Sequence, residues 1–201
     1  MPPQLTVDPQ ARGLIFDFDG TLGDTLPLHY RAWQKTAQQY QFDIAEDFFY
    51  QVVGMSSENI VRKINHQQGI ELNIPQIVTA KNDAYLSLAR QIEVFQPVFA
   101  LVRQYHGKLP IALGTSEYRD IAAANIKATG LARFFDIIVT ADDVAHPKPE
   151  PDIFLQCAEL MKVPPQFCQV FEDGAPGFAA AKRAGMILTD VRPYLREGLS
   201  A

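Results

Sequence analysis

Two aspartates two residues apart, Asp17 and Asp19, are the residues of this chain best suited to chemistry. They directly follow the apolar run 13–16 and precede Gly20, which permits a sharp turn. On an extended backbone such residues point the same way, so the two carboxylates repel each other. A divalent metal ion offsets that repulsion, and a carboxylate that it does not fully neutralise can act as a nucleophile or as an acid and base. The alternative is a solvated turn at a strand end, where Asp and Gly are common.

Three further polar segments follow apolar runs later in the chain. They bring hydroxyl, ammonium and carboxylate groups: Thr115 with Ser116, Lys148 between three prolines, and Glu172 with Asp173. Each segment alone has an ordinary interpretation as a helix cap, a surface lysine or a solvated turn. Because each follows a predicted strand, all three are expected at one edge of a parallel sheet, where ligands of such sheets bind.

The elements that would position these residues alternate between strand and helix from Pro97 onward. After the strand at 13–16, the predicted strands are 109–113, 137–139, 170–171 and 187–191. The helices predicted between them lie near 98–107, 119–129, 153–161 and 178–184. This alternation predicts an α/β fold with a doubly wound, mainly parallel sheet, right-handed crossovers and helices on both faces.

Residues 25–94 carry helix signals only. The predicted helices are 26–40, 44–53 stopping at Gly54, 56–69, and a long helix opened by Pro75 whose apolar stripe runs to Ile92. Four successive helices between two strand signals predict a separate helical-bundle cap. We therefore expect a cap domain of residues 25–94, inserted into a discontinuous core domain of residues 1–24 and 95–201.

Size and composition narrow the function classes. The chain has 201 residues, 47% hydrophobic and 20% charged, enough for a core with a small insertion. A net charge of −5 gives no support for a nucleic-acid partner, and an anionic substrate must be attracted by local positive groups. No apolar run approaches the ~20 residues of a membrane span, and residues 1–12 lack the apolar stretch of a signal peptide. We expect a monomer in the cytoplasm without a membrane partner, and Cys157 and Cys168 as small buried hydrophobes.

The ordered set of motifs resembles the haloacid dehalogenase (HAD) superfamily. Its first signature is matched by the segment Asp17-x-Asp19-Gly20-Thr21-Leu22-x-Asp24-Thr25. The Thr115, Lys148 and Glu172–Asp173 segments match the later motifs in order, and the helical insertion lies where that superfamily has its small cap. Each later motif is weak alone, but the ordered set is specific and covers essentially the whole chain.

The resemblance implies a Mg²⁺-dependent phosphatase. Asp17 would attack the phosphorus and form an aspartyl-phosphate, and Asp19 would protonate the leaving oxygen and then activate water. Mg²⁺ would be held by the Asp17 carboxylate, the Asp19 main-chain carbonyl and Asp173, with Glu172 nearby. Thr115 and Lys148 are implied as catalytic residues that also bind the substrate phosphate, and Gly20 and Ser116 as further substrate-binding residues.

A sharper resemblance, to beta-phosphoglucomutase and related sugar-phosphate phosphatases, lies in the cap. It rests on Thr25-x-x-x-His29-x-Arg31-Ala32-Trp33 and on Lys81-Asn82-Asp83-x-Tyr85. It implies a phosphorylated sugar as substrate and binding roles for Thr25, His29 and Lys81. Two alternatives stay open here. Lys81 either reaches the edge of its helix or points into the cleft between cap and core, and His29 either contacts the sugar or packs with Trp33.

One departure from the mutase pattern bears on the reaction. Where the mutase has an arginine that grips the second phosphate of its bisphosphate intermediate, this chain has Ser57. Without that guanidinium such an intermediate would be held poorly, although Arg62 lies one turn further along and could replace it. The sequence therefore favours a phosphatase for hexose phosphates such as fructose-1-phosphate. The mutase is the alternative, and a non-catalytic phosphosugar-binding protein is a weaker one.

Overall fold

The computed structural model describes residues 4–53 and 55–195, and the chain divides into two compact units. The first unit comprises Met1–Asp24 and Ile92–Ala201, and the second comprises Thr25–Gln91. The sequence analysis put the second boundary after residue 94. Residues 92–94 belong with the first unit because strand β3 (Glu93–Val94) pairs antiparallel with β2 (Gly23–Asp24).

The first unit is built on a five-stranded parallel sheet with the order β5-β4-β1-β6-β7. The strands are β1 (Gly13–Phe16), β4 (Ile111–Gly114), β5 (Ile137–Val139), β6 (Cys168–Glu172) and β7 (Ile187–Asp190). β1 is central and every residue in it is buried, as its uniformly apolar sequence requires. The predicted parallel α/β architecture is confirmed.

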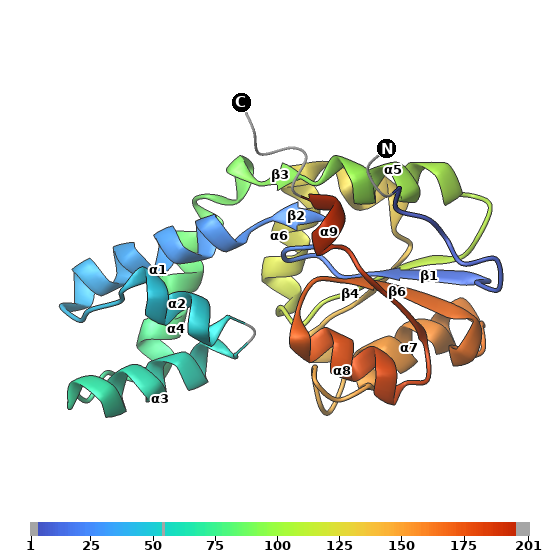
Figure 1. Cartoon of the computed structure of the whole chain (residues 1–201). Coiled ribbons are helices and arrows are strands. Elements are labelled where there is room, and N and C mark those ends of the chain that lie inside the picture. The colour runs from blue at the N-terminus through green and yellow to red at the C-terminus, as the bar shows by residue number, and fades with distance from the viewer. Residues whose placement is uncertain (1–3, 54, 196–201) are drawn as a thin grey trace. The chain divides into compact units, whose positions relative to one another are not determined.

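Helices cover both faces of this sheet (Figure 1). They are α5 (Gln96–Tyr105), α6 (Arg119–Thr129), α7 (Asp152–Met161), α8 (Ala175–Arg183) and the short α9 (Arg192–Leu195). Leu14 and Phe16 of β1 pack with α5 and α6, whereas Ile15 packs with α7 and α8. Alternate residues of one strand thus contribute to two separate hydrophobic cores, one on each face of the sheet, which is the doubly wound arrangement.

The cysteines lie in these cores, as predicted. Cys157 and Cys168 are both fully buried and unbridged. Burial raises the pKa of the Cys168 thiol to about 11 and that of Cys157 further still. Neither thiol is therefore suited to nucleophilic chemistry near neutral pH.

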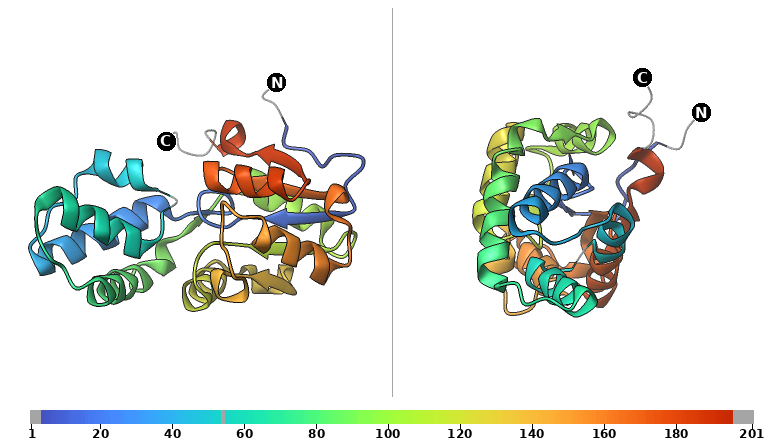
Figure 2. Two further views of the ribbon diagram at one scale, coloured as in Figure 1. Left: turned by 90° about the horizontal axis from the view of Figure 1, so that it is seen from below. Right: turned by 90° about the vertical axis from the view of Figure 1, so that its left-hand side faces the viewer.

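The second unit consists of four helices packed around their own core (Figure 2). They are α1 (Leu26–Tyr40), α2 (Glu46–Val52), α3 (Ser57–Gln68) and α4 (Ile74–Leu86), followed by a 3-10 turn, η1 (Ala89–Gln91). The predicted caps of α3 are present, because Ser56 Oγ accepts from the Asn59 backbone N–H and Gly69 has a φ of 63°. Gly54, the predicted stop of the second helix, lies outside the described residues.

One helix prediction was wrong. The apolar stripe was expected to continue as helix to Ile92, but α4 ends at Leu86. There Ser87 Oγ donates to the Ala84 carbonyl, and the chain tightens into η1. Ile92 instead packs against the core of the first unit. Within the described residues, no helix combines the length and apolar character needed to cross a membrane.

Candidate active site

Three adjacent strands deliver the predicted residues to the same sheet edge. Asp17 follows β1, Thr115 follows β4, and Glu172 ends β6. The backbone N–H of Asp17 donates to the Phe171 carbonyl at 3.1 Å, which fixes the start of the first loop beside β6. Because β4, β1 and β6 are neighbours and parallel, their carboxyl ends bring these side chains together.

The loop after Asp17 is a compact turn closed on one carbonyl. The Phe18 carbonyl accepts from the backbone N–H groups of Thr21, Leu22 and Gly23 at 2.9 to 3.2 Å. Gly20 has a φ of +85°, and a Cβ added to it would lie 2.3 Å from Asp173 Oδ2. Glycine is therefore required here both for the turn and for the close approach of Asp173.

Lys148 joins two carboxylates of the site. Its Nζ lies 2.5 Å from Asp17 Oδ1 and 3.1 Å from Glu172 Oε1, and its side chain is only 4% exposed. Burial alone would lower the pKa of this ammonium, but the attraction of Asp17 and Glu172 outweighs burial and raises it above its usual value. Lys148 is thus held charged inside the site.

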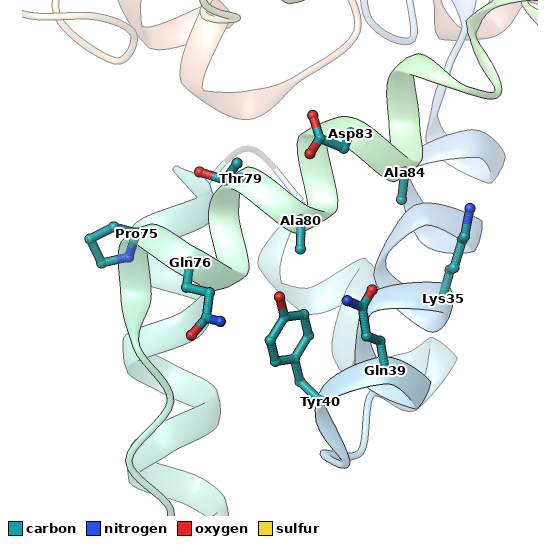
Figure 3. Close-up of a pocket in the computed structure, with 9 residues that line it drawn as sticks. All are labelled: Lys35, Gln39, Tyr40, Pro75, Gln76, Thr79, Ala80, Asp83 and Ala84. Atoms are coloured by element: carbon teal, nitrogen blue, oxygen red, sulfur yellow. The ribbon is translucent and has the colours of Figure 1, made fainter.

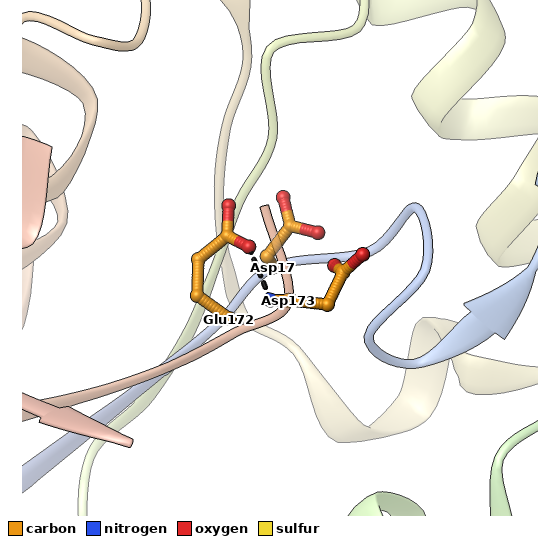
Figure 4. A group of neighbouring side chains, drawn as sticks. All are labelled: Asp17, Glu172 and Asp173. Carbon is orange, nitrogen blue, oxygen red and sulfur yellow. Dashed lines mark hydrogen bonds between the residues drawn. The ribbon is translucent and has the colours of Figure 1, made fainter. Parts of the chain in front are cut away.

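Asp17, Glu172 and Asp173 form an acidic cluster, shown in Figure 4. Each offers one carboxylate oxygen, and these oxygens lie within 4.8 Å of one another. Glu172 Oε2 accepts from the backbone N–H groups of Asp173 and Gly174, at 2.5 and 2.7 Å. Thr21 Oγ1 donates to Asp173 Oδ1 at 2.8 Å. The cluster is therefore oriented by its own surroundings.

The negative charge of this cluster is only partly neutralised by the charged groups around it. Burial raises the pKa of Asp17 well above its usual value, and the negative charge of Glu172 adds to the effect. Burial and Glu172 also raise the pKa of Asp173 to about 7. Among the described residues, Lys148 is the only cation that forms an ion pair with the cluster, and its partners are Asp17 and Glu172. Hard oxygen donors with two negative charges in excess fit a divalent cation such as Mg²⁺.

Asp19 and Thr115 lie beside the cluster, and Ser116 follows them in an exposed position. Asp19 is half-buried and forms a β-bridge with Gly23. Thr115 Oγ1 lies 3.4 Å from Asp19 Oδ2 and accepts from the Glu117 backbone N–H at 3.1 Å. The Asp19 carboxylate is not part of the three-carboxylate cluster, and its predicted metal contact was through the main-chain carbonyl.

The predicted cap residues lie in the second unit, two of them around one aromatic ring. The His29 ring stacks on Tyr85 with centroids 4.0 Å apart, and Lys81 Nζ lies 5.4 Å from the Tyr85 centroid. Lys81 is 2% exposed, so its ammonium does not reach solvent along the helix edge. Its closest recorded polar contact is Asn82 Oδ1 at 3.4 Å. Thr25 is buried just before α1, and its hydroxyl has no hydrogen-bond partner among the described residues.

A groove of about 490 Å³ lies within the second unit, between α1 and α4 (Figure 3). Its lining mixes polar and apolar surface, and its lining residues are Lys35, Gln39, Tyr40, Pro75, Gln76, Thr79, Ala80, Asp83 and Ala84. Of the predicted site residues, none lines this groove. It is separate from the residues at the sheet edge of the first unit.

Two residues that shape the site were not given roles by the sequence analysis. Thr21 orients Asp173, and Gly177 in α8 leaves room for Glu172, since a Cβ there would lie 1.8 Å from Glu172 Oε1. A usable signal existed for Gly177, because glycine inside a helix is unfavourable and usually has a packing reason. Thr21 carried none beyond its place in the first motif.

Comparison with known proteins identifies the class of protein that this fold and site define. Residues 14–191 match the family model for haloacid dehalogenase-like hydrolases. The chain is 38% identical over 182 residues to fructose-1-phosphate phosphatase YqaB of Escherichia coli (strain K12), covering 90% of this chain and 96% of that protein. It is 28% identical over 188 residues to beta-phosphoglucomutase of Bacillus subtilis (strain 168), covering 90% and 83%.

A solved structure gives the same result in three dimensions. CbbY from Rhodobacter sphaeroides, in complex with phosphate, superposes with a TM-score of 0.81 at 25% identity, covering 93% of this chain and 89% of that chain. The chain belongs to the haloacid dehalogenase-like hydrolase family. The family predicted from its four motifs is confirmed.

Proposed function

We propose that this protein is a Mg²⁺-dependent phosphatase that hydrolyses a small sugar phosphate, with fructose-1-phosphate as the first candidate. The observation that carries the proposal is the buried Lys148 ammonium, bonded to both Asp17 and Glu172 beside Asp173. An ammonium and a divalent cation at one acidic cluster can together accept a phosphate dianion. The named activity of the Escherichia coli relative supports the choice of sugar phosphate.

The metal would be held by the Asp17 carboxylate, the Asp19 main-chain carbonyl and Asp173, with Glu172 nearby. When bound, Mg²⁺ supplies charge that stabilises the transferred phosphoryl group. Asp17 and Glu172 are buried and Asp173 is partly buried, which supports this role, since the mutual repulsion of the three carboxylates disfavours full ionisation without a cation.

In the first step Asp17 acts as the nucleophile. Its Oδ1 accepts the Lys148 hydrogen bond, so Oδ2 is the oxygen that attacks phosphorus. The new Oδ2–P bond forms as the bond between phosphorus and the sugar oxygen breaks. Asp19 gives its proton to that oxygen, and the sugar leaves as a neutral alcohol while Asp17 carries the phosphoryl group.

In the second step Asp19 acts as the base. It accepts a proton from a water molecule, whose oxygen bonds to phosphorus as the Asp17–phosphorus bond breaks. Inorganic phosphate leaves, and Asp17 and the protonated Asp19 are regenerated. The contact between Thr115 Oγ1 and Asp19 Oδ2 would hold the Asp19 carboxyl group in position for these proton transfers.

The remaining phosphate contacts would come from Lys148, the Thr115 hydroxyl, Ser116 and the backbone at Gly20. In this proposal the second unit, Thr25–Gln91, is the cap, and it selects the sugar and excludes bulk water. Thr25, His29 and Lys81 would contact the sugar or its phosphate. The buried positions of these three residues in the second unit support specific roles rather than solvated ones.

A phosphate-release screen over a panel of sugar phosphates, with Mg²⁺ and with EDTA, tests the proposal. We expect release from fructose-1-phosphate or a related hexose phosphate with Mg²⁺, and loss of release with EDTA. Asp17→Asn should abolish it. Full release by that variant would refute the nucleophile assignment.

Beta-phosphoglucomutase activity is the second candidate, favoured by the 28% identity to the Bacillus subtilis enzyme. Against it, Ser57 begins α3 where the mutase pattern described above has arginine, and Arg62 Nη1 donates to Asn59 Oδ1 at 3.2 Å. Incubation with beta-glucose-1-phosphate and a bisphosphate primer separates the two. Glucose-6-phosphate would indicate a mutase, and free phosphate a phosphatase.

A further inference from the structure

An aromatic ring lies against the Lys148 ammonium. Lys148 Nζ is 4.7 Å from the centroid of the Phe154 ring. Phe154 is in the first turns of α7, six residues after Lys148, and it is fully buried in the core that contains Ile15 and Cys157. Its neighbours in that core make packing the ordinary explanation for Phe154. The position of the cation near the ring is a further property that packing alone does not require.

The distance and the burial are those of an effective cation–π contact. Such contacts occur within about 6 Å of the ring centroid and are strongest where water is excluded. Here the Lys148 side chain is 4% exposed and Phe154 has no exposed surface. The ammonium therefore has two kinds of partner: the carboxylates of Asp17 and Glu172, and the ring of Phe154.

The same ring also touches the strand that leads to Thr115. A Cβ added to Gly114, the last residue of β4, would lie 3.3 Å from Phe154 Cδ1. Together with Ile153 and Cys157, Phe154 therefore fills the space that a side chain at Gly114 would need. It lies in contact with two of the segments that supply the phosphate-binding groups, one bearing Lys148 and the other preceding Thr115.

We propose that Phe154 is a positioning residue, whose ring face fixes the Lys148 ammonium at the place where it receives the substrate phosphate. The proposal rests on the function proposed above for Lys148. Aliphatic side chains of similar size would fill the core but would provide no negative ring face for the cation. Phe154 then acts on substrate only through Lys148.

Stepwise fluorination of Phe154 tests this without changing the shape of the core. Fluorine atoms withdraw charge from the ring face and weaken a cation–π contact in proportion to their number. We expect kcat/KM for the sugar phosphate to fall in order with one, two and three fluorines, by about tenfold at the third. Most of the change should be in KM, since the ammonium contacts phosphate before any bond changes. Phe154→Leu should show at least the same loss.

The matched control is the same fluorination series at Phe135, which is 3% exposed and has no cation over its ring among the described residues. Thermal midpoints should stay close to the parent protein in both series. Equal kcat/KM across the Phe154 series would overturn the proposal, as would an equal loss in the Phe135 series.

A binding measurement separates this proposal from the proposed function. Titration calorimetry with inorganic phosphate and Mg²⁺ measures the anion site without turnover. A graded loss of phosphate affinity along the Phe154 series supports the role of the ring even if no sugar phosphate is hydrolysed. Unchanged phosphate affinity along that series overturns it, whatever the enzyme's activity.

Discussion

Gly177 has no side chain where Glu172 needs space. The Glu172 carboxylate lies against α8, accepts two backbone N–H groups and holds Lys148, and a Cβ on Gly177 would overlap its Oε1. We expect Gly177→Ala to displace Glu172 and lower kcat/KM by about 100-fold, the upper range for residues that orient metal ligands. Steady-state phosphate release at varied Mg²⁺ measures this.

Gly174→Ala is the matched control for that substitution. Gly174 is three residues earlier, and a Cβ there would meet atoms only at an ordinary 3.7 Å. Its kcat/KM should stay within about threefold of the parent, because the Gly174 backbone N–H to Glu172 is retained. If Gly177→Ala were as active as Gly174→Ala, the assigned position of Glu172 would be wrong.

Asp173 gives a pH prediction for the metal-free protein. Burial and Glu172 raise its pKa to about 7, against about 3.9 in an unfolded chain. The folded protein therefore binds this proton more tightly, and the stability so gained is present below pH about 4 and is lost as pH rises to about 7. Without metal, the thermal midpoint of the parent should fall over this window more than that of Asp173→Asn.

At about pH 7.5 in EDTA we expect the thermal midpoint of Asp173→Asn to lie about 4 °C above that of the parent. In a chain of this size that difference corresponds to a little over 1 kcal/mol in the free energy of unfolding. The Asn side chain can still accept from Thr21. Added Mg²⁺ should raise the midpoint of the parent and leave that of the variant unchanged. A variant less stable than the parent in EDTA at this pH would contradict the inferred repulsion between Asp173 and its neighbouring carboxylates.

At the residue scale, the order of the motifs located the charged groups of the site but not the residues that position them. Asp17, Lys148 and Asp173 are identifiable from the sequence because each is a charged residue in a polar segment that follows a predicted strand. Gly177 and Phe154 are near these groups only after α7 and α8 fold back on the sheet. Their roles depend on distances between segments, which a pattern of residue types does not contain.

The β2–β3 ribbon is the element through which both connections to the inserted helices pass. It pairs Asp24 directly with Glu93. Burial and the charge of Glu93 raise the pKa of Asp24, as expected for like charges opposite each other. Strands of two residues give no periodic signal, and the sequence analysis therefore placed Asp24 in the first motif and Glu93 in the helical insertion without predicting either strand.

Removing one charge from this ribbon should stabilise the protein. We expect Glu93→Gln to raise the thermal midpoint at neutral pH by about 1–2 °C, corresponding to about 0.5 kcal/mol of relieved repulsion. The gain should disappear below pH about 4, where Asp24 is protonated in both proteins. Glu71→Gln, an exposed glutamate of the second unit, is the control and should have no effect. A destabilised Glu93→Gln would contradict the repulsion.

At the scale of elements, helices with strong capping residues were predictable to their ends, and the end of α4, which lacks one, was not. The bounds of α6 and the caps of α3 matched because Gly130, Gly69 and Ser56 are strong local signals. The end of α4 was missed because apolar spacing continues beyond Leu86 while the backbone does not. There a local side-chain bond from Ser87 competes with the helix.

The whole molecule consists of two units that each have their own hydrophobic core. Since Asp24 and Glu93 are paired neighbours, a short turn containing Asn-Gly could replace the second unit, residues 25–91, and keep Ile92 in the core of the first unit. We expect this shortened protein to unfold cooperatively and to bind Mg²⁺ by calorimetry. Its kcat/KM for sugar phosphates should fall by at least about 100-fold, because substrate positioning is lost. Failure to fold would show that the first unit depends on the second.

The order of the motifs and the strand-helix alternation were enough to predict the sheet, the family and the site at its edge. The identity of the sugar was not predictable, since in the proposed function it depends on how side chains of the inserted helices are presented to substrate. Predicting substrate from such a chain requires those orientations, whereas predicting the chemistry requires only the strand ends.

Trapping of the phosphorylated enzyme tests the central claim most directly. Borohydride reduces an acyl phosphate to an alcohol, so it would convert a phosphorylated Asp17 to homoserine, which mass spectrometry locates in the peptide. With fructose-1-phosphate and Mg²⁺, we predict this conversion at Asp17, and we predict that it is absent without substrate and absent in Asp17→Asn. Continued phosphate release with no reduction at Asp17, or with reduction at another carboxylate, would contradict the account.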